Sequence, residues 1–390
     1  MSNNICPLPW MSIETSPIGT ARPCCLARES IKDQTGTDMQ ISKHGIIEMF
    51  DSSYMQQIRQ TMLAGGKPET CKLCWDEEAV GRKSKRLSSI EKFRFTPDIN
   101  TKPSLSFIDL KLGNQCNLKC RMCGSWSSSS WAEEEIAIDG DNSRAAVWLA
   151  QGQWPNVSEK FWDDLEQVMP HILYMEITGG EPLMIKNHYR FLKQAVESGH
   201  SKHISIHYNT NGTLLPKQAM RDLWPHFKSV EMAFSIDDLN ERFEYQRHPA
   251  KWDLVNHNME QFWEHSKQHR NFTTQICCTV NMFNITNIQN VAYWIQSKPF
   301  DYVYLNLLHS DPVWSIKNLP DSVKQLVMSR IDLIKLSGDI RSQLVPILDF
   351  MHQPAEIELF TERKERIIKH DDYRKENFIA VFPELSELLC

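Results

Sequence analysis

Three cysteines lie close together in the run QCNLKCRMCG, as Cys116, Cys120 and Cys123 in a C-x3-C-x2-C spacing. Three thiolates can ligate three irons of a [4Fe–4S] cluster and leave the fourth iron open. An open iron can bind and reduce a substrate or co-substrate, whereas a cluster with four protein ligands mainly stores or relays electrons. Structural zinc usually has four ligands in paired knuckles. The spacing therefore favours a reaction centre, with a structural metal site as the alternative.

The composition restricts the partners and the compartment. The chain has 390 residues and a formal net charge of −6, which gives no general attraction to nucleic acid or anionic membranes. Eight of the eleven cysteines fall within the first 123 residues, which indicates metal ligation in a reducing compartment rather than disulfides. No apolar run approaches the ~20 residues that cross a bilayer, and the start MSNNICPLPW lacks the layout of a signal peptide. We therefore expect a cytoplasmic protein.

Short β-rich runs alternate with amphipathic helical stretches from about Leu105 onward, which predicts right-handed βαβ units and a parallel sheet. The predicted strands are Leu105–Leu112, Ile172–Thr178, Ile204–Asn209, Val230–Ser235, Gln275–Val280 and Val303–Leu308. The predicted helices between them are Tyr189–Ser198, Lys217–Trp224, Asp253–His265 and Ile288–Gln296. Six repeats indicate an α/β fold with a partial (β/α)6 TIM-like barrel, in which reactive groups gather at the carboxyl ends of the strands.

Further helices are expected outside these repeats. The stretch Ser125–Gly152 is too long for a simple crossover and should carry a helix that begins at its serine cluster. Helices are also predicted at Ser322–Leu336, Ser342–His352 and Glu362–Arg374, and the apolar end FIAVFPELSELL should dock on the barrel. The basic run Arg82, Lys83, Lys85 and Arg86 is expected to lie exposed to solvent on a helix or linker.

Four distinctive runs each follow a predicted strand, so they should share one rim of the barrel. They are the cysteine loop, TGGEP, NTNGT and SIDD. In TGGEP, Gly179 and Gly180 allow close backbone approach to a ligand, and the Glu181 carboxylate can accept hydrogen bonds from an ammonium group. The small polar residues of these runs can also simply terminate strands, and that alternative stays open.

The runs CNLKCRMC and TGGEP together resemble the radical S-adenosylmethionine enzymes, and the resemblance covers roughly Ser104 to His309. It implies that Cys116, Cys120 and Cys123 ligate a catalytic [4Fe–4S] cluster whose open iron binds S-adenosylmethionine. It further implies that Gly179, Gly180 and Glu181 position the methionyl end of that cofactor. The remaining cofactor contacts that it suggests are Met122 at the adenine, Ser235 and Asp237 at the ribose, Asn209 at the ribose or substrate, and Arg247 at the carboxylate or an acidic substrate.

The N-terminal cysteines, in the arrangement Cys6-x12-Gly19-x4-Cys24 followed by Cys71-x2-Cys74, are similar to a twitch domain, the shortened relative of the SPASM domain. The resemblance suggests a second, auxiliary [4Fe–4S] cluster held by Cys6, Cys24, Cys71 and Cys74, and only the family spacing selects Cys24 over Cys25. A structural zinc on the same thiolates is the alternative. Gly19 suits a hairpin turn, and a helix Ser53–Leu63 should separate the cysteine pairs.

This organisation predicts an auxiliary module with its linker at 1–103, the barrel at 104–311 and a helical extension at 312–390. The family resemblance implies reductive cleavage of S-adenosylmethionine to a 5′-deoxyadenosyl radical, hydrogen abstraction from a peptide or protein side chain, and a flavodoxin or ferredoxin as electron donor. The alternatives are dehydrogenation or epimerisation of a small polar molecule, such as a sugar or aminoglycoside, and a non-catalytic iron–sulfur or zinc scaffold.

One cysteine doublet, Cys277–Cys278, lies on a predicted strand, so one side chain should face the barrel interior and the other the helices. Buried structural cysteines are the default expectation. The alternative is that the interior thiol returns a hydrogen atom to a substrate radical, as an epimerase requires.

Overall fold

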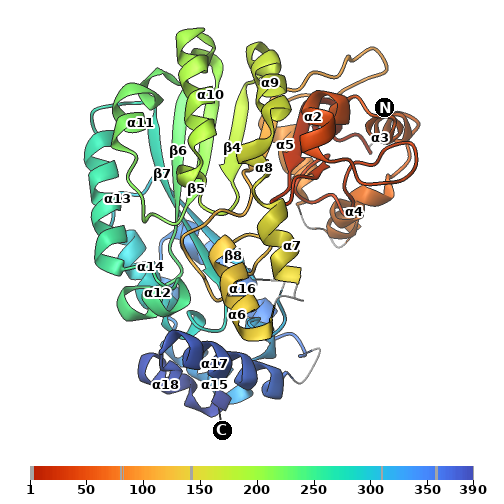
Figure 1. Ribbon diagram of the computed structural model, residues 1–390. Coiled ribbons are helices and arrows are strands. Elements are labelled where there is room, and N and C mark those ends of the chain that lie inside the picture. The colour runs from red at the N-terminus through yellow and green to blue at the C-terminus, as the bar shows by residue number, and fades with distance from the viewer. Residues whose placement is uncertain are drawn as a thin grey trace.

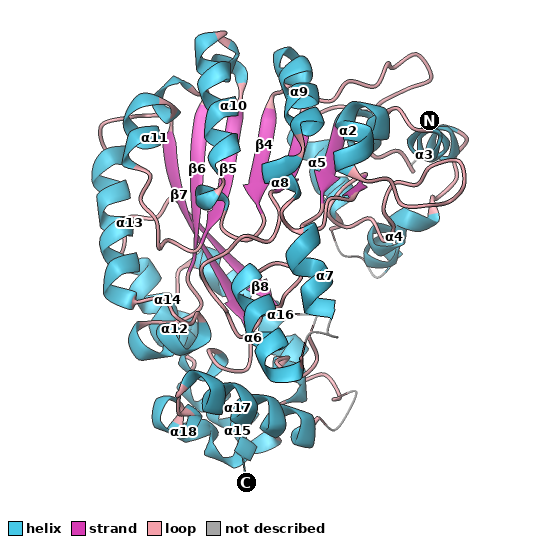
Figure 2. Ribbon diagram, in the orientation of Figure 1, coloured by secondary structure: helices cyan, strands magenta, loops and turns pink. Residues whose placement is uncertain are grey.

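An eight-stranded, mostly parallel sheet forms the centre of the computed structural model, which describes residues 4–79, 81, 83–140, 144–308, 311–355 and 359–389 (Figures 1 and 2). The strand order is β2-β1-β3-β4-β5-β6-β7-β8, and only the β1–β2 pair is antiparallel. The strands are β1 Ser12–Thr15, β2 Ala21–Arg22, β3 Phe107–Lys111, β4 Tyr174–Thr178, β5 Ser205–Thr210, β6 Ser229–Ser235, β7 Phe272–Val280 and β8 Tyr302–Leu307. The six strands β3 to β8 match the six predicted ones.

Helices separate consecutive strands of this parallel series and cover one face of the sheet (Figure 1). Between β3 and β4 lie α6 Ser129–Asp139, α7 Arg144–Gln151, α8 Trp154–Val157 and α9 Glu159–Val168. The later crossovers contain α10 Lys186–Glu197, α11 Lys217–Asp222, α12 Asn240–Gln246, α13 Trp252–Ser266 and α14 Ile288–Gln296. The predicted α/β class and its alternating helices and strands are confirmed.

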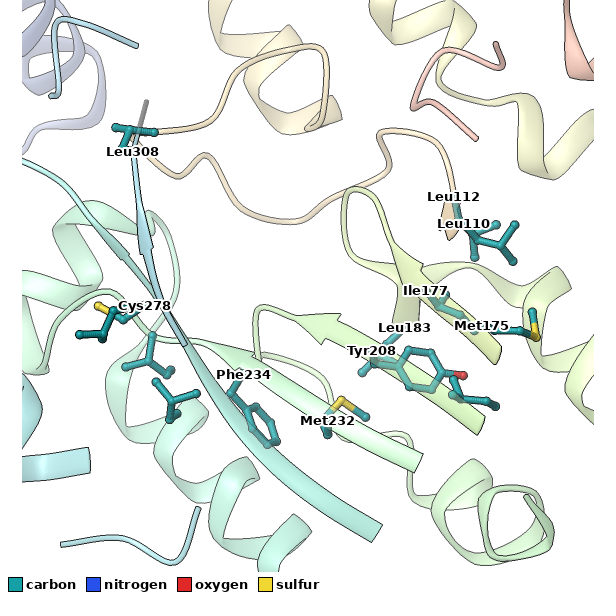
Figure 3. Packing of buried hydrophobic residues seen from close by; sticks show 14 of the residues in the cluster. Leu110, Leu112, Met175, Ile177, Leu183, Tyr208, Met232, Phe234, Cys278 and Leu308 are labelled. Carbon is teal, nitrogen blue, oxygen red and sulfur yellow. The ribbon is translucent and has the colours of Figure 1, made fainter. Parts of the chain in front are cut away.

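The sheet has an apolar face and a polar face. Along β5, Ile206 and Tyr208 are buried against the helices, whereas His207 and Asn209 alternate with them and are only half-buried. Figure 3 shows the apolar side chains of neighbouring strands gathered into one cluster, including Tyr208, Met232 and Cys278. Each fully buried large apolar side chain contributes about 1.5–3 kcal/mol, so this face fixes the strand register and leaves the other face free for polar groups.

The N-terminal segment joins the sheet of the barrel. Its strand β1 pairs in parallel with β3, with Ser12 opposite Phe107, and turns back into β2 through the predicted hairpin at Gly19, whose φ is +81°. Its helices are α1 Leu8–Met11, α2 Ile41–Phe50, α3 Ser53–Leu63, α4 Lys72–Ala79 and α5 Lys85–Phe93. The predicted helix Ser53–Leu63 is confirmed. The sheet continues across residue 103, where the sequence predicted a division. This continuation was not predicted because β1 is only four residues long.

Most of the C-terminal helices pack below α6 and α12 in the view of Figure 1, whereas the one formed by residues 338–351 lies against β8. They are α15 Asp321–Arg330, α16 Gly338–Met351, α17 Phe360–Arg374 and α18 Phe378–Val381. The first ends at Arg330, earlier than predicted, and the apolar end of the chain is docked as expected, with Phe378, Phe382 and Leu385 buried. Among the described residues, no helix is long and apolar enough to cross a membrane.

Candidate functional site

The cysteine loop runs from the end of β3 to the start of α6 and is held by the serines that begin this helix. Ser128 caps α6 by accepting from the Trp131 amide at 3.3 Å, and its hydroxyl donates to the Leu118 carbonyl at 2.6 Å. The Ser130 hydroxyl donates to the Cys116 carbonyl at 2.8 Å. The predicted helix start is confirmed, and the same serines also fix the loop backbone.

The TGGEP loop binds directly to the backbone of the cysteine loop. The Gly180 amide donates to the Gly113 carbonyl at 3.3 Å, and the Glu181 amide donates to the Gln115 carbonyl at 2.8 Å. A Cβ at Gly180 would lie 2.2 Å from the Gln115 carbonyl oxygen, and Gly179 has a φ of +116°. The predicted close approach of Gly179 and Gly180 therefore exists, but in this structure it is to the cysteine loop.

Glu181 is buried, at 1% exposure, and joins the ends of β4 and β5. Its carboxylate accepts hydrogen bonds from the Thr210 hydroxyl at 2.9 Å, the Asn211 amide at 2.7 Å and the Leu183 amide at 3.1 Å. Burial raises the pKa of Glu181 to about 7, although these bonds lower it. A carboxylate has about four acceptor positions, so three are occupied by the protein and about one is left for a ligand.

The three thiols of the cysteine loop lie near one another and near two polar side chains, one just after β5 and one at the end of α12. Burial raises the pKa of Cys123, and the charges of Cys120 and Cys116 raise it further. The Asn211 side-chain amide lies 3.9 Å from Cys116 Sγ, and Arg247 Nη1 lies 3.9 Å from Cys120 Sγ. Thiols with raised pKa values are protonated at neutral pH, so ligation would require a metal to displace their protons.

Arg247 is buried at 8% exposure, so it does not form a surface ion pair. Its Nη2 lies 2.7 Å from Asp237 Oδ2, while Asp237 Oδ1 accepts from the Thr279 amide at 2.8 Å. The Nε of Arg247 has no hydrogen-bond partner among the described residues. Asp237 is fully buried and its carboxylate contacts Arg247, while its contact to a ribose stays a prediction.

The other predicted cofactor contacts differ in position. Asn209 and Ser235 are half-buried at the carboxyl ends of β5 and β6, where small polar side chains can face a ligand. Met122 is half-buried and packs against the hydrophobic core. On β7, Cys278 is fully buried in the apolar cluster (Figure 3), whereas Cys277 is half-buried beside Tyr304 of β8. The predicted division of this doublet between the two faces is confirmed.

A second cysteine group surrounds a cavity in the N-terminal segment, lined by Cys6, Cys24, Cys71, Cys74, mainly apolar residues and the side chains of Lys85 and Arg86. Burial raises the pKa of Cys6, and the charges of the other three thiols raise it further. Cys25 does not line this cavity. Among the described residues, no group of three or more histidine, cysteine or acidic side chains is arranged to hold a single metal ion.

The basic run at the start of α5 is solvated only in part, because the Lys83 side chain is exposed, as predicted, and pairs with Glu91. Lys85 donates to Cys25 Sγ at 2.8 Å, and Arg86, at 6% exposure, donates to Glu78 at 2.9 Å and to the Ile5 carbonyl at 2.9 Å. Arg82 lies outside the described residues. The expectation is wrong for Lys85 and Arg86 because α5 packs between the cysteine cavity and the sheet, which a charge run alone does not reveal.

Sequence reasoning also missed a row of ionisable side chains across the polar face of the sheet. The strand register places them opposite one another as Glu14, Asp109, Glu176, His207 and Glu231. Glu14 pairs with Arg22 at 2.6 Å, and His207 with Glu231 at 2.5 Å. Asp109 is 4% exposed, and its side chain has neither a hydrogen bond nor an ion pair among the described residues. Alternation of polar residues within each strand was the available signal.

The comparisons with known proteins agree with the position of the cysteine loop. Residues 110–264 match the Radical SAM superfamily. Native anSMEcpe with bound AdoMet is a similar solved structure, at 18% identity and a TM-score of 0.40, covering 67% of this chain and 66% of that one. Another is Streptococcus suis SuiB bound to precursor peptide SuiA, at 13% identity and a TM-score of 0.36, covering 85% and 64%.

The matches leave part of each compared protein uncovered. The chain spans less than two thirds of the length of these structures, and 60% of polyhistidine-tagged anSMEcpe with bound AdoMet, which has 18% identity and a TM-score of 0.38 over 58% of this chain. No curated protein matches the sequence. Residues 110–264 nevertheless resemble the Radical SAM superfamily over a stretch that includes both the cysteine loop and the TGGEP loop.

Proposed function

We propose that the chain uses S-adenosylmethionine and a [4Fe–4S] cluster on Cys116, Cys120 and Cys123 to abstract hydrogen from a substrate. The observation that carries this proposal is the grouping of three thiols at the carboxyl end of the sheet, next to the TGGEP loop. When bound, the cluster supplies an electron and the sulfonium cofactor supplies the radical that removes the hydrogen. The protein supplies position and a dry environment.

The donor set fits the cofactor. Three thiolates leave one iron for an amino acid moiety. The buried Arg247 has one unpartnered nitrogen, so it can bind a carboxylate, and Glu181 retains acceptor capacity for an ammonium group. We assign Asp237 the role of orienting Arg247, and Asn209 and Ser235 the role of polar contacts to the nucleoside or substrate.

We further propose an auxiliary [4Fe–4S] cluster on Cys6, Cys24, Cys71 and Cys74. The four thiols share one cavity, whereas Cys25 does not line it and accepts a hydrogen bond from Lys85, which supports Cys24 as the ligand. Four protein ligands leave no iron for substrate, so this site would accept or pass electrons. That role suits a net oxidation of substrate.

The proposed substrate is a peptide or protein side chain, as the resemblance to peptide-modifying family members implies. A small polar substrate is the second candidate, and one observation favours it. Asp109 and Glu176 lie on the polar face of the sheet, near Lys85 of α5. This face therefore offers polar contacts to a substrate rather than an apolar groove. Mass spectrometry of peptides and small molecules from cells with the active enzyme or the Cys116→Ala variant separates these candidates.

The central test is anaerobic reconstitution followed by an assay for 5′-deoxyadenosine with dithionite and S-adenosylmethionine. We expect about eight irons per chain, four for each cluster, and cofactor cleavage that requires Cys116. The Cys278→Ala variant is a matched control, because Cys278 is buried on the apolar face of β7, contacts neither thiol group, and reaches Asp237 through its backbone carbonyl, at 3.7 Å. Cleavage that persists in Cys116→Ala would refute the proposed function.

A further inference from the structure

Two basic residues, Lys119 and Arg121, lie between the cysteines of the loop, and both side chains form ion pairs with carboxylates. The Arg121 side chain is 1% exposed, and its Nη2 lies 2.6 Å from Asp371 Oδ1 and 2.5 Å from Glu376 Oε2. Its guanidinium also stacks 3.7 Å from the centre of the Tyr245 ring. Arg121 and Asp371 are 250 residues apart in the sequence, so this contact joins the loop to the C-terminal helix α17.

The second cation, Lys119, joins the same helix through Glu134 of α6. Glu134 is fully buried and lies 2.9 Å from Lys119 Nζ, 2.8 Å from His370 Nδ1 and 3.0 Å from Arg374 Nε. Burial alone would raise the pKa of Glu134, but the bond from His370 and the charge of Arg374 lower it to about 2. Helix α17 therefore contacts both cations of the cysteine loop, consistent with its position below α6 in Figure 1.

The backbone of the loop is held from the opposite side by the segment that carries Arg247. The Lys119 amide donates to the His248 carbonyl at 2.6 Å, and the Arg121 amide donates to the Gln246 carbonyl at 2.8 Å. The His248 ring in turn lies 2.6 Å from Glu376. One carboxylate thus contacts both the cysteine loop and the residue next to Arg247.

We propose that Glu134, Asp371 and Glu376, here called the carboxylate clamp, are positioning residues for the cluster loop and for Arg247. The inference rests on the proposed function of the cysteine loop and extends its active site to the C-terminal helix. A buried charge that loses its partner moves toward water or toward another partner. Removing a clamp carboxylate therefore displaces Arg121 and the thiols on either side of it.

A matched control exists in the same C-terminal segment. Glu384 lies 2.7 Å from Arg242 and accepts from the Thr286 hydroxyl at 2.8 Å, so it also joins the C-terminus to the barrel. Arg242 belongs to α12, and neither partner contacts the cysteine loop. Glu384→Gln removes a comparable ion pair without touching the clamp.

The experiment compares Glu376→Gln, Asp371→Asn and Glu384→Gln with the wild type after anaerobic reconstitution. The readouts are iron content, the EPR spectrum of the reduced protein with and without S-adenosylmethionine, 5′-deoxyadenosine formation and thermal unfolding. We expect the two clamp variants to lose at least about tenfold in 5′-deoxyadenosine formation and to change the EPR shift on cofactor addition. The control variant Glu384→Gln should keep 5′-deoxyadenosine formation and the EPR shift at the wild-type level.

The outcomes separate the inference from the proposed function. If the wild type itself forms no 5′-deoxyadenosine, the proposed function fails. If the wild type is active and the clamp variants match Glu384→Gln in rate and EPR spectrum, the clamp has no positioning role. Should a clamp variant fail to fold, Arg121→Lys keeps the charge but loses the planar guanidinium that contacts both carboxylates through Nη2 and stacks on Tyr245, and an unchanged EPR spectrum there would overturn the proposal.

Discussion

The two cysteine groups differ in ligand number and in their surroundings. The barrel loop brings three thiols together beside Arg247 and Asn211, polar side chains that contact them at 3.9 Å. The N-terminal group brings four thiols around a cavity whose other walls are mainly apolar, such as Leu8, Met62 and Trp75. The first group has one ligand position left open, whereas the second has four thiols, with Lys85 and Arg86 as the charged residues that also line its cavity. The comparison indicates chemistry at the first and electron storage or structure at the second.

The largest effect should come from the barrel loop. Cys116→Ala removes one of only three thiols, so the proposed cluster loses its ligand set, and we expect 5′-deoxyadenosine formation to fall at least about 100-fold. Liquid chromatography of the reaction mixture measures it, with Cys278→Ala as control. If Cys116→Ala formed 5′-deoxyadenosine within a few fold of the wild-type rate, the barrel loop would not be the reactive one of the two cysteine groups.

A smaller effect is expected in the N-terminal group. Cys74→Ala should lower the iron content by about half, because one of the two proposed clusters is lost. Cofactor cleavage driven by dithionite without substrate should stay within about twofold of wild type, since the barrel thiols remain. Iron analysis and the 5′-deoxyadenosine assay check both statements. A full loss of cleavage would show that the two groups do not act separately.

The choice between adjacent cysteines sharpens the assignment further. Cys24 lines the four-thiol cavity, whereas Cys25 accepts a hydrogen bond from Lys85. We therefore expect Cys24→Ala to lose the same share of iron as Cys74→Ala, and Cys25→Ala to keep the wild-type content. Equal loss in both variants would contradict the assignment.

The smallest expected effect concerns the polar face of the barrel. Burial, together with the charge of Glu176, raises the pKa of Asp109. The folded state then holds a proton that the unfolded state releases, so the stability of the wild type falls as the pH rises from the unfolded pKa through the folded one. Asp109→Asn should raise the free energy of unfolding by about 1–3 kcal/mol at mildly alkaline pH, and by much less at about pH 4.

Chemical denaturation at both pH values measures this difference. Glu231→Gln is the matched control, because Glu231 stands in the same row but is paired with His207 at 2.5 Å, so no gain in stability is expected from it. A loss of stability in Asp109→Asn at alkaline pH would mean that the carboxylate has a stabilising partner. The polar face of the barrel would then not lower the stability of the fold, and the contrast with the mainly apolar N-terminal cavity would be smaller.

The sequence predicted the six barrel strands and the cysteine loop because both depend on local patterns. Strand β5, for instance, alternates polar and apolar residues from Ser205 to Asn209. Strand β1 was missed, since four residues carry too little pattern. The burial of Arg247 and the contact between Arg121 and Asp371 depend on chain segments far apart in sequence, and charge alone does not distinguish a buried ion pair from a solvated side chain.

The parallel pairing of β1 with β3 also has a practical consequence. If residues 1–103 were deleted to isolate the barrel, β3 would become an unprotected edge strand with free amide and carbonyl groups and apolar neighbours, and such edges pair with other chains. The truncated protein is therefore expected to aggregate. The same hydrogen bonds fix the separation between the two proposed clusters, so the tunnelling distance for an electron is set by the sheet and not by a flexible tether.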